Sequence, residues 1–177
     1  MLFHLFISVI LMAQSYQTQP YEVVSTIDQI EIRYYPPAMK VQVESTSSNN
    51  RNFNALFQYI SGNNDKGEKI AMTTPVYMEN KKGSQTMAFV LPAQYTDTAP
   101  QPKGSGVEVF QSKAGYFAAI RYGGYSNPGK VKQYTQQLMN ILSLAEKKII
   151  GQALVLSYDA PYKFYNRRNE ILLEIAQ

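Results

Sequence analysis

The side chains that most often carry acid–base, nucleophilic or metal chemistry are scarce in this sequence. Cysteine is absent from the 177 residues, which excludes disulfides, a thiolate nucleophile and cysteine metal ligands. The single histidine is His4, so a serine–histidine triad or a histidine proton switch would depend on the extreme N-terminus. The 13 aspartates and glutamates are scattered without a metal-ligand spacing. These features favour binding over catalysis, and an enzyme that uses glutamate and tyrosine as acid and base is the less favoured hypothesis.

An apolar and aromatic helix face is the strongest candidate for a binding surface. Residues 51–60 are predicted to form a helix, in which apolar side chains recur at spacings of three, one and three. Such a face packs on a sheet or, where its rings remain exposed, receives a flat apolar ligand. The four residues that share this face are Phe53, Leu56, Phe57 and Ile60.

The first 15 residues are typical of an export signal. Residues 1–12 are almost wholly apolar, but this run is shorter than the ~20 residues needed to span a bilayer. Ala13 and Ser15 supply small residues at the spacing that signal peptidase recognises. We therefore predict a signal peptide over residues 1–15, a periplasmic or secreted protein, and no stable membrane span after cleavage. An N-terminal segment that remains as an anchor is the alternative, and cleavage would also remove His4.

The charged and aromatic composition narrows the kind of partner. Lysine and arginine outnumber aspartate and glutamate by 17 to 13, which gives a formal net charge of +4. Because the basic residues form no run or stripe, we expect no nucleic-acid partner. The 14 tyrosines provide rings with one polar tip, which suit a half-buried sheet or a polar pocket. The sequence leaves the oligomeric state open.

Alternating apolar and polar residues predict an antiparallel sheet in a single domain over residues 16–177. A second helix is expected to begin at Asn127 and Pro128, an N-cap residue followed by proline at the first helical position. Strands precede and follow both helices in the same order, which indicates two similar halves and an α+β fold. The clearest strand segments are residues 30–34, 41–44, 87–91 and 171–175.

Five sequence blocks occur in the order and at the spacing of a known family. They are residues 33–37 (RYYPP), 64–76 (with NDKG and IAMTTPV), 89–92 (FVLP), 122–125 (YGGY) and 158–171 (with RRNEI). On these blocks the chain resembles the SOUL/heme-binding protein family over residues 21–175. The resemblance implies a distorted antiparallel eight-stranded β-barrel with two flanking helices, built from two pseudo-repeated halves. It also implies non-catalytic, non-covalent binding of heme or a related tetrapyrrole.

The resemblance further implies a location for the tetrapyrrole, on the apolar surface near the first helix. It also implies that cations near that surface meet the propionates, and the corresponding residues here are Arg51 and Lys163. The family's basic position on the first helix falls near Asn50, next to Arg51. The apolar part of the site corresponds to Phe53, Leu56, Phe57 and Ile60.

The iron ligand stays open, because the histidine proposed for some family members has no counterpart here. At ~25 cal/mol per Å² of buried apolar area, a few hundred Å² supplies several kcal/mol, so binding does not require a metal–protein bond. Kinship with effector-sensing domains leaves another hypothesis, a pocket for another apolar or cationic ligand lined by tyrosines and Glu170. The candidate iron ligands are Tyr59, Tyr77, Met72 and Met78.

Overall fold

The structure, a computed structural model, describes residues 16–46 and 48–177. Its helices are α1 (Asn49–Ile60) and α2 (Pro128–Leu144). Two short strands near the N-terminal segment are β1 (Gln17–Thr18) and β5 (Thr73–Thr74). The remaining strands are β2 (Glu22–Ile27), β3 (Ile30–Tyr35), β4 (Ala38–Ser45), β6 (Val76–Lys81), β7 (Ser84–Val90), β8 (Val107–Ser112), β9 (Gly115–Tyr122), β10 (Leu154–Ser157) and β11 (Asn169–Ile175).

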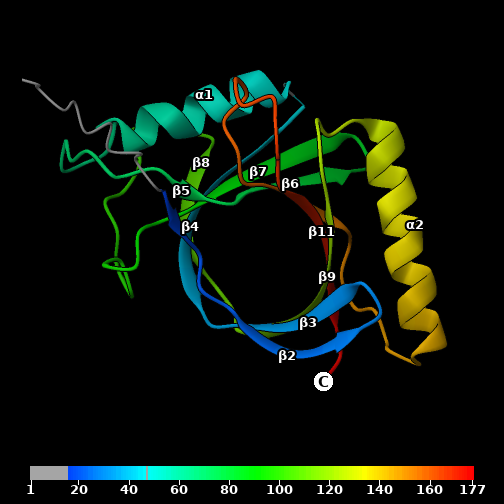
Figure 1. The fold of residues 1–177 in the computed structure, drawn as a ribbon. Coiled ribbons are helices and arrows are strands. Elements are labelled where there is room, and N and C mark those ends of the chain that lie inside the picture. Colours follow the sequence, from blue (N-terminus) through cyan, green and yellow to red (C-terminus); the bar gives the residue numbers. More distant parts are fainter. Residues whose placement is uncertain (1–15, 47) are drawn as a thin grey trace, which may run out of the picture.

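Nine strands form one curled antiparallel sheet in the order β2-β3-β9-β11-β10-β6-β7-β4-β8. Figure 1 shows that the sheet bends into a barrel-like wall and that both helices lie outside it. The α+β architecture expected from the sequence is thereby confirmed. The ninth strand arises because β2 folds back on β3 through a tight turn, in which Asp28 has a positive φ of 50°.

The two halves of the chain repeat one pairing pattern. In the first half β4 pairs with β7, and β7 pairs with β6, with α1 inserted between β4 and β5. In the second half β9 pairs with β11, and β11 pairs with β10, with α2 inserted between β9 and β10. Pairing of β3 with β9, β4 with β8 and β10 with β6 joins the halves. The pseudo-repeat expected from the order of elements is thus a repeat of topology.

Side-chain alternation gives the wall an outer and an inner face. On the outer face α1 and α2 each cover one half, as the 3.6-residue period of their apolar residues requires. The inner face is packed largely with tyrosine and small or branched apolar residues. The core between α1 and the wall includes Val41, Phe89 and Leu56, and the core between α2 and the wall includes Ile120, Ile171 and Leu138. The inner cluster includes Tyr35, Tyr77, Leu156 and Leu172.

The N-terminal segment that precedes β2 crosses from the helix side of the wall to its inner face. β1 pairs in parallel with β5, and the backbone N–H of Gln19 donates to the carbonyl of Thr74 at 2.8 Å. Gln19 is buried, and its Oε1 accepts a hydrogen bond from the Tyr77 hydroxyl at 2.7 Å. Tyr21 then packs against Tyr35 with ring centroids 5.2 Å apart. This path brings Tyr21 to the polar network of the inner face.

The expected start of α2 is confirmed. The Asn127 side chain accepts a hydrogen bond from the backbone N–H of Lys130 at 2.9 Å, and Pro128 is the first helical residue. The first helix begins at Asn49, two residues earlier than the sequence pattern predicted. Both helices are therefore fixed on the outer face, and their exposed sides are the ones available to a partner.

Candidate functional site

The apolar residues of α1 divide into a buried pair and an aromatic pair. Leu56 and Ile60 are buried in the core between α1 and the wall, so they support the helix from beneath. Phe53 is half-buried, with its ring 5.2 Å from that of Phe89. Phe57 is 49% exposed and stacks on Phe53 with centroids 6.0 Å apart and planes 14° apart. The surface of α1 therefore offers a phenyl pair backed by aliphatic packing.

Three further exposed aromatic residues lie in the β10–β11 connection, and the sequence analysis did not select them. Tyr162, Phe164 and Tyr165 are 81%, 76% and 66% exposed, and the rings of Phe164 and Tyr165 meet edge to face at 5.4 Å. Large apolar side chains gathered in one exposed segment mark an interaction surface more often than scattered ones do. The signal in the sequence was the aromatic density of residues 158–165, in a loop where no period governs side-chain direction.

Arg167 holds this aromatic connection in a defined shape. Its buried guanidinium donates from Nη1 to the carbonyls of Ala160 (2.7 Å) and Lys163. It also lies over the Tyr125 ring, 4.5 Å from the centroid. These contacts bridge residues at both ends of the connection, so Tyr162, Phe164 and Tyr165 project from a supported loop.

Asp159 organises the same connection electrostatically. Its Oδ2 accepts the backbone N–H of Arg168 at 2.6 Å, and its Oδ1 forms an ion pair with Lys163. Desolvation opposes the charge on Asp159, but the hydrogen bonds from Lys163 and from the Arg168 backbone outweigh it and lower the pKa of Asp159. Lys163, one of the two predicted cations, is therefore half-buried and already paired.

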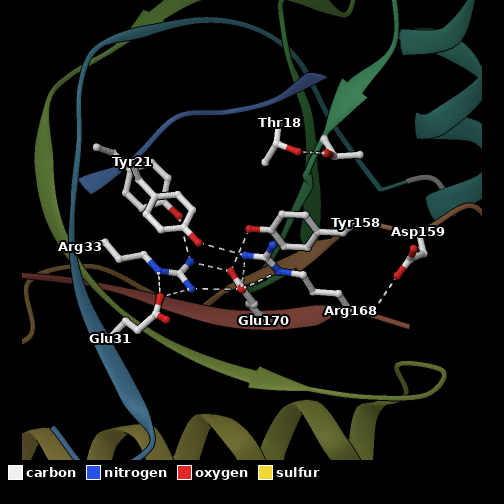
Figure 2. A network of polar contacts seen from close by, with 10 residues as sticks. Thr18, Tyr21, Glu31, Arg33, Tyr158, Asp159, Arg168 and Glu170 are labelled. Carbon is white, nitrogen blue, oxygen red and sulfur yellow. Dashed lines mark hydrogen bonds and ion pairs between the residues drawn. The ribbon is translucent and has the colours of Figure 1, made fainter. Parts of the chain in front are cut away.

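The second predicted cation, Arg51, lies exposed in the first turns of α1. Its side chain makes no ion pair within residues 16–46 and 48–177. Figures 1 and 2 both draw the β10–β11 connection on the side of α1. We call the exposed residues of α1 and of this connection the aromatic face. Its members are Phe57, Tyr162, Phe164 and Tyr165, with the cations Arg51 and Lys163.

A separate polar network occupies the inner face of the wall around Glu170 (Figure 2). Glu170 is fully buried and accepts hydrogen bonds from both Arg33 and Arg168. The Tyr158 hydroxyl donates to its Oε2 at 2.8 Å. Desolvation opposes ionisation, but the two guanidinium groups outweigh it and lower the pKa of Glu170. Because two internal cations already neutralise this carboxylate, it is poorly suited to bind a cationic ligand.

None of the four candidate iron ligands is among the exposed residues of the aromatic face. Tyr59 is buried and donates to the carbonyl of Pro100 at 2.7 Å, while Tyr77 donates to Gln19. Burial raises the pKa of both phenols, which therefore stay protonated. Met72 and Met78 are half-buried against the core. Among the described residues, no group of three or more histidine, aspartate or glutamate side chains could hold a metal ion.

Comparison with known proteins gives consistent family matches. The family model described as SOUL heme-binding protein matches residues 16–174. Heme-binding protein 2 of Homo sapiens is 31% identical over 158 residues, which cover 81% of this chain and 76% of that protein. Heme-binding protein 1 of Mus musculus is 29% identical over 126 residues, which cover 67% of this chain and 66% of that protein.

Solved structures with the same fold are more distant in sequence. The crystal structure of the EcmrR C-terminal domain has a TM-score of 0.59 at 11% identity, covering 84% of this chain and 98% of that one. The crystal structure of a hydrolase from Listeria innocua has a TM-score of 0.59 at 7% identity, covering 84% and 92%. At these identities the likeness shows the fold alone.

Proposed function

Because the chain belongs to the SOUL heme-binding protein family, we propose that it binds heme non-covalently on the aromatic face. Heme is the ligand that the family match and the heme-binding relatives support. The observation that carries the location is the exposed set of aromatic side chains on α1 and the β10–β11 connection. Folded proteins rarely leave this many rings uncovered in neighbouring segments without a partner.

The chemistry of the aromatic face fits a porphyrin, which is a large, flat, mostly apolar ring with two carboxylates. An aromatic side chain carries about 150–250 Å² of surface, so partial burial of three or four rings yields a few hundred Å². At ~25 cal/mol per Å² this provides several kcal/mol before the costs of ordering. Micromolar affinity is therefore within reach of the aromatic contacts.

The cations of the face suit the propionates to different degrees. Arg51 is exposed and unpaired in the described part of the chain, so its guanidinium is available for a carboxylate. Lys163 already forms an ion pair with Asp159, so a propionate would have to share the Lys163 ammonium with that carboxylate. The phenol oxygens of Tyr162 and Tyr165 are exposed on this face, where they would be available to the heme iron. Bound heme would supply a redox-active iron and a strong visible absorption band.

Titration of the purified protein with hemin tests this proposal. We expect a saturable shift of the Soret band and quenching of tyrosine fluorescence with a one-to-one end point. Replacing both Phe57 and Phe164 with alanine should weaken binding at least fivefold. The matched control is Leu144→Ala, which removes a strongly exposed apolar side chain at the end of α2. A spectrum that equals free hemin, or equal losses in the control, would falsify the proposal.

We also propose that residues 1–15 direct export. These residues lie outside the described part of the chain, so the support is their composition alone. Within residues 16–46 and 48–177, no helix is both long and apolar enough to cross a bilayer. Cell fractionation with N-terminal sequencing should find a mature chain that begins at Tyr16. A membrane-bound chain that still begins at Met1 would favour the anchor instead.

A further inference from the structure

A polar cavity of about 170 Å³ opens on the inner face of the wall beside the Glu170 network. The share of liquid volume that one water occupies is about 30 Å³, so the cavity admits several waters or a small organic ion. It is distinct from the aromatic face, because none of its lining residues belongs to that face. The lining residues are Tyr21, Gln29, Glu31, Arg33, Ala119, Arg121, Arg168 and Glu170.

Strand register brings three arginines to this cavity. Arg121 on β9 is the direct cross-strand partner of Glu170 on β11, and directly opposed residues of an antiparallel pair point to the same face. Arg168 precedes Glu170 by two residues and also points inward, since it donates to the Glu170 carboxylate. Arg33 reaches the same carboxylate from β3. Three guanidinium groups therefore face two carboxylates, those of Glu31 and Glu170.

The carboxylates and Arg33 satisfy one another. Arg33 is 3% exposed, and it donates to Glu31, to Tyr35 and twice to Glu170. Its Nη2 also lies 2.7 Å from Glu31 Oε2, so its donors are engaged. The lowered pKa of Glu170 means that this carboxylate remains charged at neutral pH and keeps its partners. An incoming ligand therefore meets the remaining arginine donors.

Those remaining donors come from Arg121 and Arg168. The Arg121 side chain makes no hydrogen bond or ion pair with any residue of the described chain, although its backbone belongs to β9. Arg168 uses Nε and Nη2 toward Glu170 and Tyr21, whereas its Nη1 has no hydrogen bond to any described residue. The Arg168 guanidinium lies 3.9 Å from the centroid of the Tyr158 ring, which fixes its plane. One unneutralised positive charge and several N–H groups thus border a polar cavity.

We propose that this cavity binds a small anion with a carboxylate or phosphate group, held between Arg121 and Nη1 of Arg168. The planar donor fork of arginine matches the oxygens of both groups. Glu31, half-exposed at the rim, repels the ligand and so limits its affinity. Since the aromatic face shares no residue with the cavity, we expect the anion and heme to bind independently of each other.

Amide chemical shifts of the full protein, followed by ¹H–¹⁵N NMR at constant ionic strength, test this site. The probes are inorganic phosphate and acetate, each titrated against sodium chloride as the reference. We expect saturable shifts at Tyr21, Gln29, Arg121 and Arg168 with a Kd of about 1 mM, which is typical of a few charged hydrogen bonds. Saturation by one probe assigns the ligand group to phosphate or to carboxylate, and saturation by both shows a general oxyanion site.

Three variants should change the anion affinity in predictable directions. Arg121→Gln should weaken binding at least fivefold, Arg121→Lys should be intermediate, and Glu31→Gln should tighten binding at least twofold. Lys132→Gln, which removes one exposed positive charge on α2, is the matched control and should stay within twofold of the parent. Unsaturable shifts with both probes, or equal losses in Arg121→Gln and Lys132→Gln, overturn the site. Hemin affinity should not change in Arg121→Gln, so failure of one proposal is distinguishable from failure of the other.

Discussion

Arg33 meets the buried carboxylate of Glu170 with both terminal nitrogens, Nη1 to Oε2 at 2.7 Å and Nη2 to Oε1 at 3.1 Å. The two residues are 137 positions apart in the chain and lie on β3 and β11. β9 lies between these strands in the sheet, so the ion pair spans a strand on the inner face. This side-chain bridge ties the N-terminal part of the wall to its last strand.

Removing the charge of Glu170 should strongly destabilise the fold. In Glu170→Gln, Arg168 would lose its carboxylate partner and the buried Arg33 would keep only Glu31, and breaking a buried pair in this way costs about 3–5 kcal/mol. Urea unfolding of the variant should therefore show a clearly lower midpoint. Glu44→Gln removes an exposed carboxylate that pairs with Lys81, and should leave the midpoint unchanged. Equal midpoints for the two variants would show that the buried network adds no stability.

The same network predicts a direction for the pH dependence. The folded-state pKa of Glu170 lies below its ordinary value of 4.5. Stability from this group is therefore complete above that ordinary value and is lost as the pH falls through the folded-state pKa. Urea unfolding between pH 7 and pH 3 should show this loss in the parent protein. The acid limb should be shallower in Glu170→Gln, and an equally steep limb would exclude this carboxylate as its source.

Lys40 should give a second rise of stability with pH, in the alkaline range. Burial on the inner face lowers its pKa to about 8, although its ammonium lies 3.7 Å from the centroid of the Tyr77 ring. Because the unfolded chain then binds more protons than the folded one, stability should rise between pH 7 and pH 9. Lys40→Met keeps the stem and removes the charge, so it should abolish this rise and increase stability at pH 7. A Lys40 ammonium signal that stays fully protonated through pH 9 in ¹⁵N NMR would contradict this assignment.

The predicted cations should discriminate between porphyrins with and without free carboxylates. Exposed ion pairs contribute about 0.2–1 kcal/mol, so Arg51→Gln and Lys163→Gln should each weaken hemin binding by up to about fivefold. The dimethyl ester of the same porphyrin lacks the propionate charges, and its affinity should be the same for parent and variants. Parallel losses with the acid and the ester would assign these side chains to packing or to loop shape.

The sequence predicted the elements better than their contacts. The start of α2 follows from Asn127 and Pro128, since both act within one helical turn. Arg168 pairs with Glu170 two residues along the chain, a spacing that the sequence shows. The other cation that pairs with Glu170 is Arg33, which only the strand order β3-β9-β11 brings near.

For the binding surface too, the sequence predicted the helix but not which of its side chains stay exposed. Helical periodicity placed Leu56 and Phe57 on one face of the helix. A period of 3.6 residues predicts the direction of each side chain, but it does not predict how deeply the sheet buries that side chain. The fold buries Leu56 and leaves Phe57 half-exposed. Tyr162 and Phe164 lie in a connection where no period applies, and their exposure depends on the contacts of Arg167 with the loop backbone.

Paramagnetic broadening by hemin tests the central claim most directly, because the iron broadens the NMR signals of nearby amides whatever its ligand. We expect signals from residues 53–57 and 161–165 to lose intensity first, while those of β2 and α2 remain sharp. The gallium(III) analogue, which is diamagnetic, should shift the same signals without broadening them. Broadening centred on the inner face around Glu170, or spread evenly over the protein, would contradict a heme site on the aromatic face.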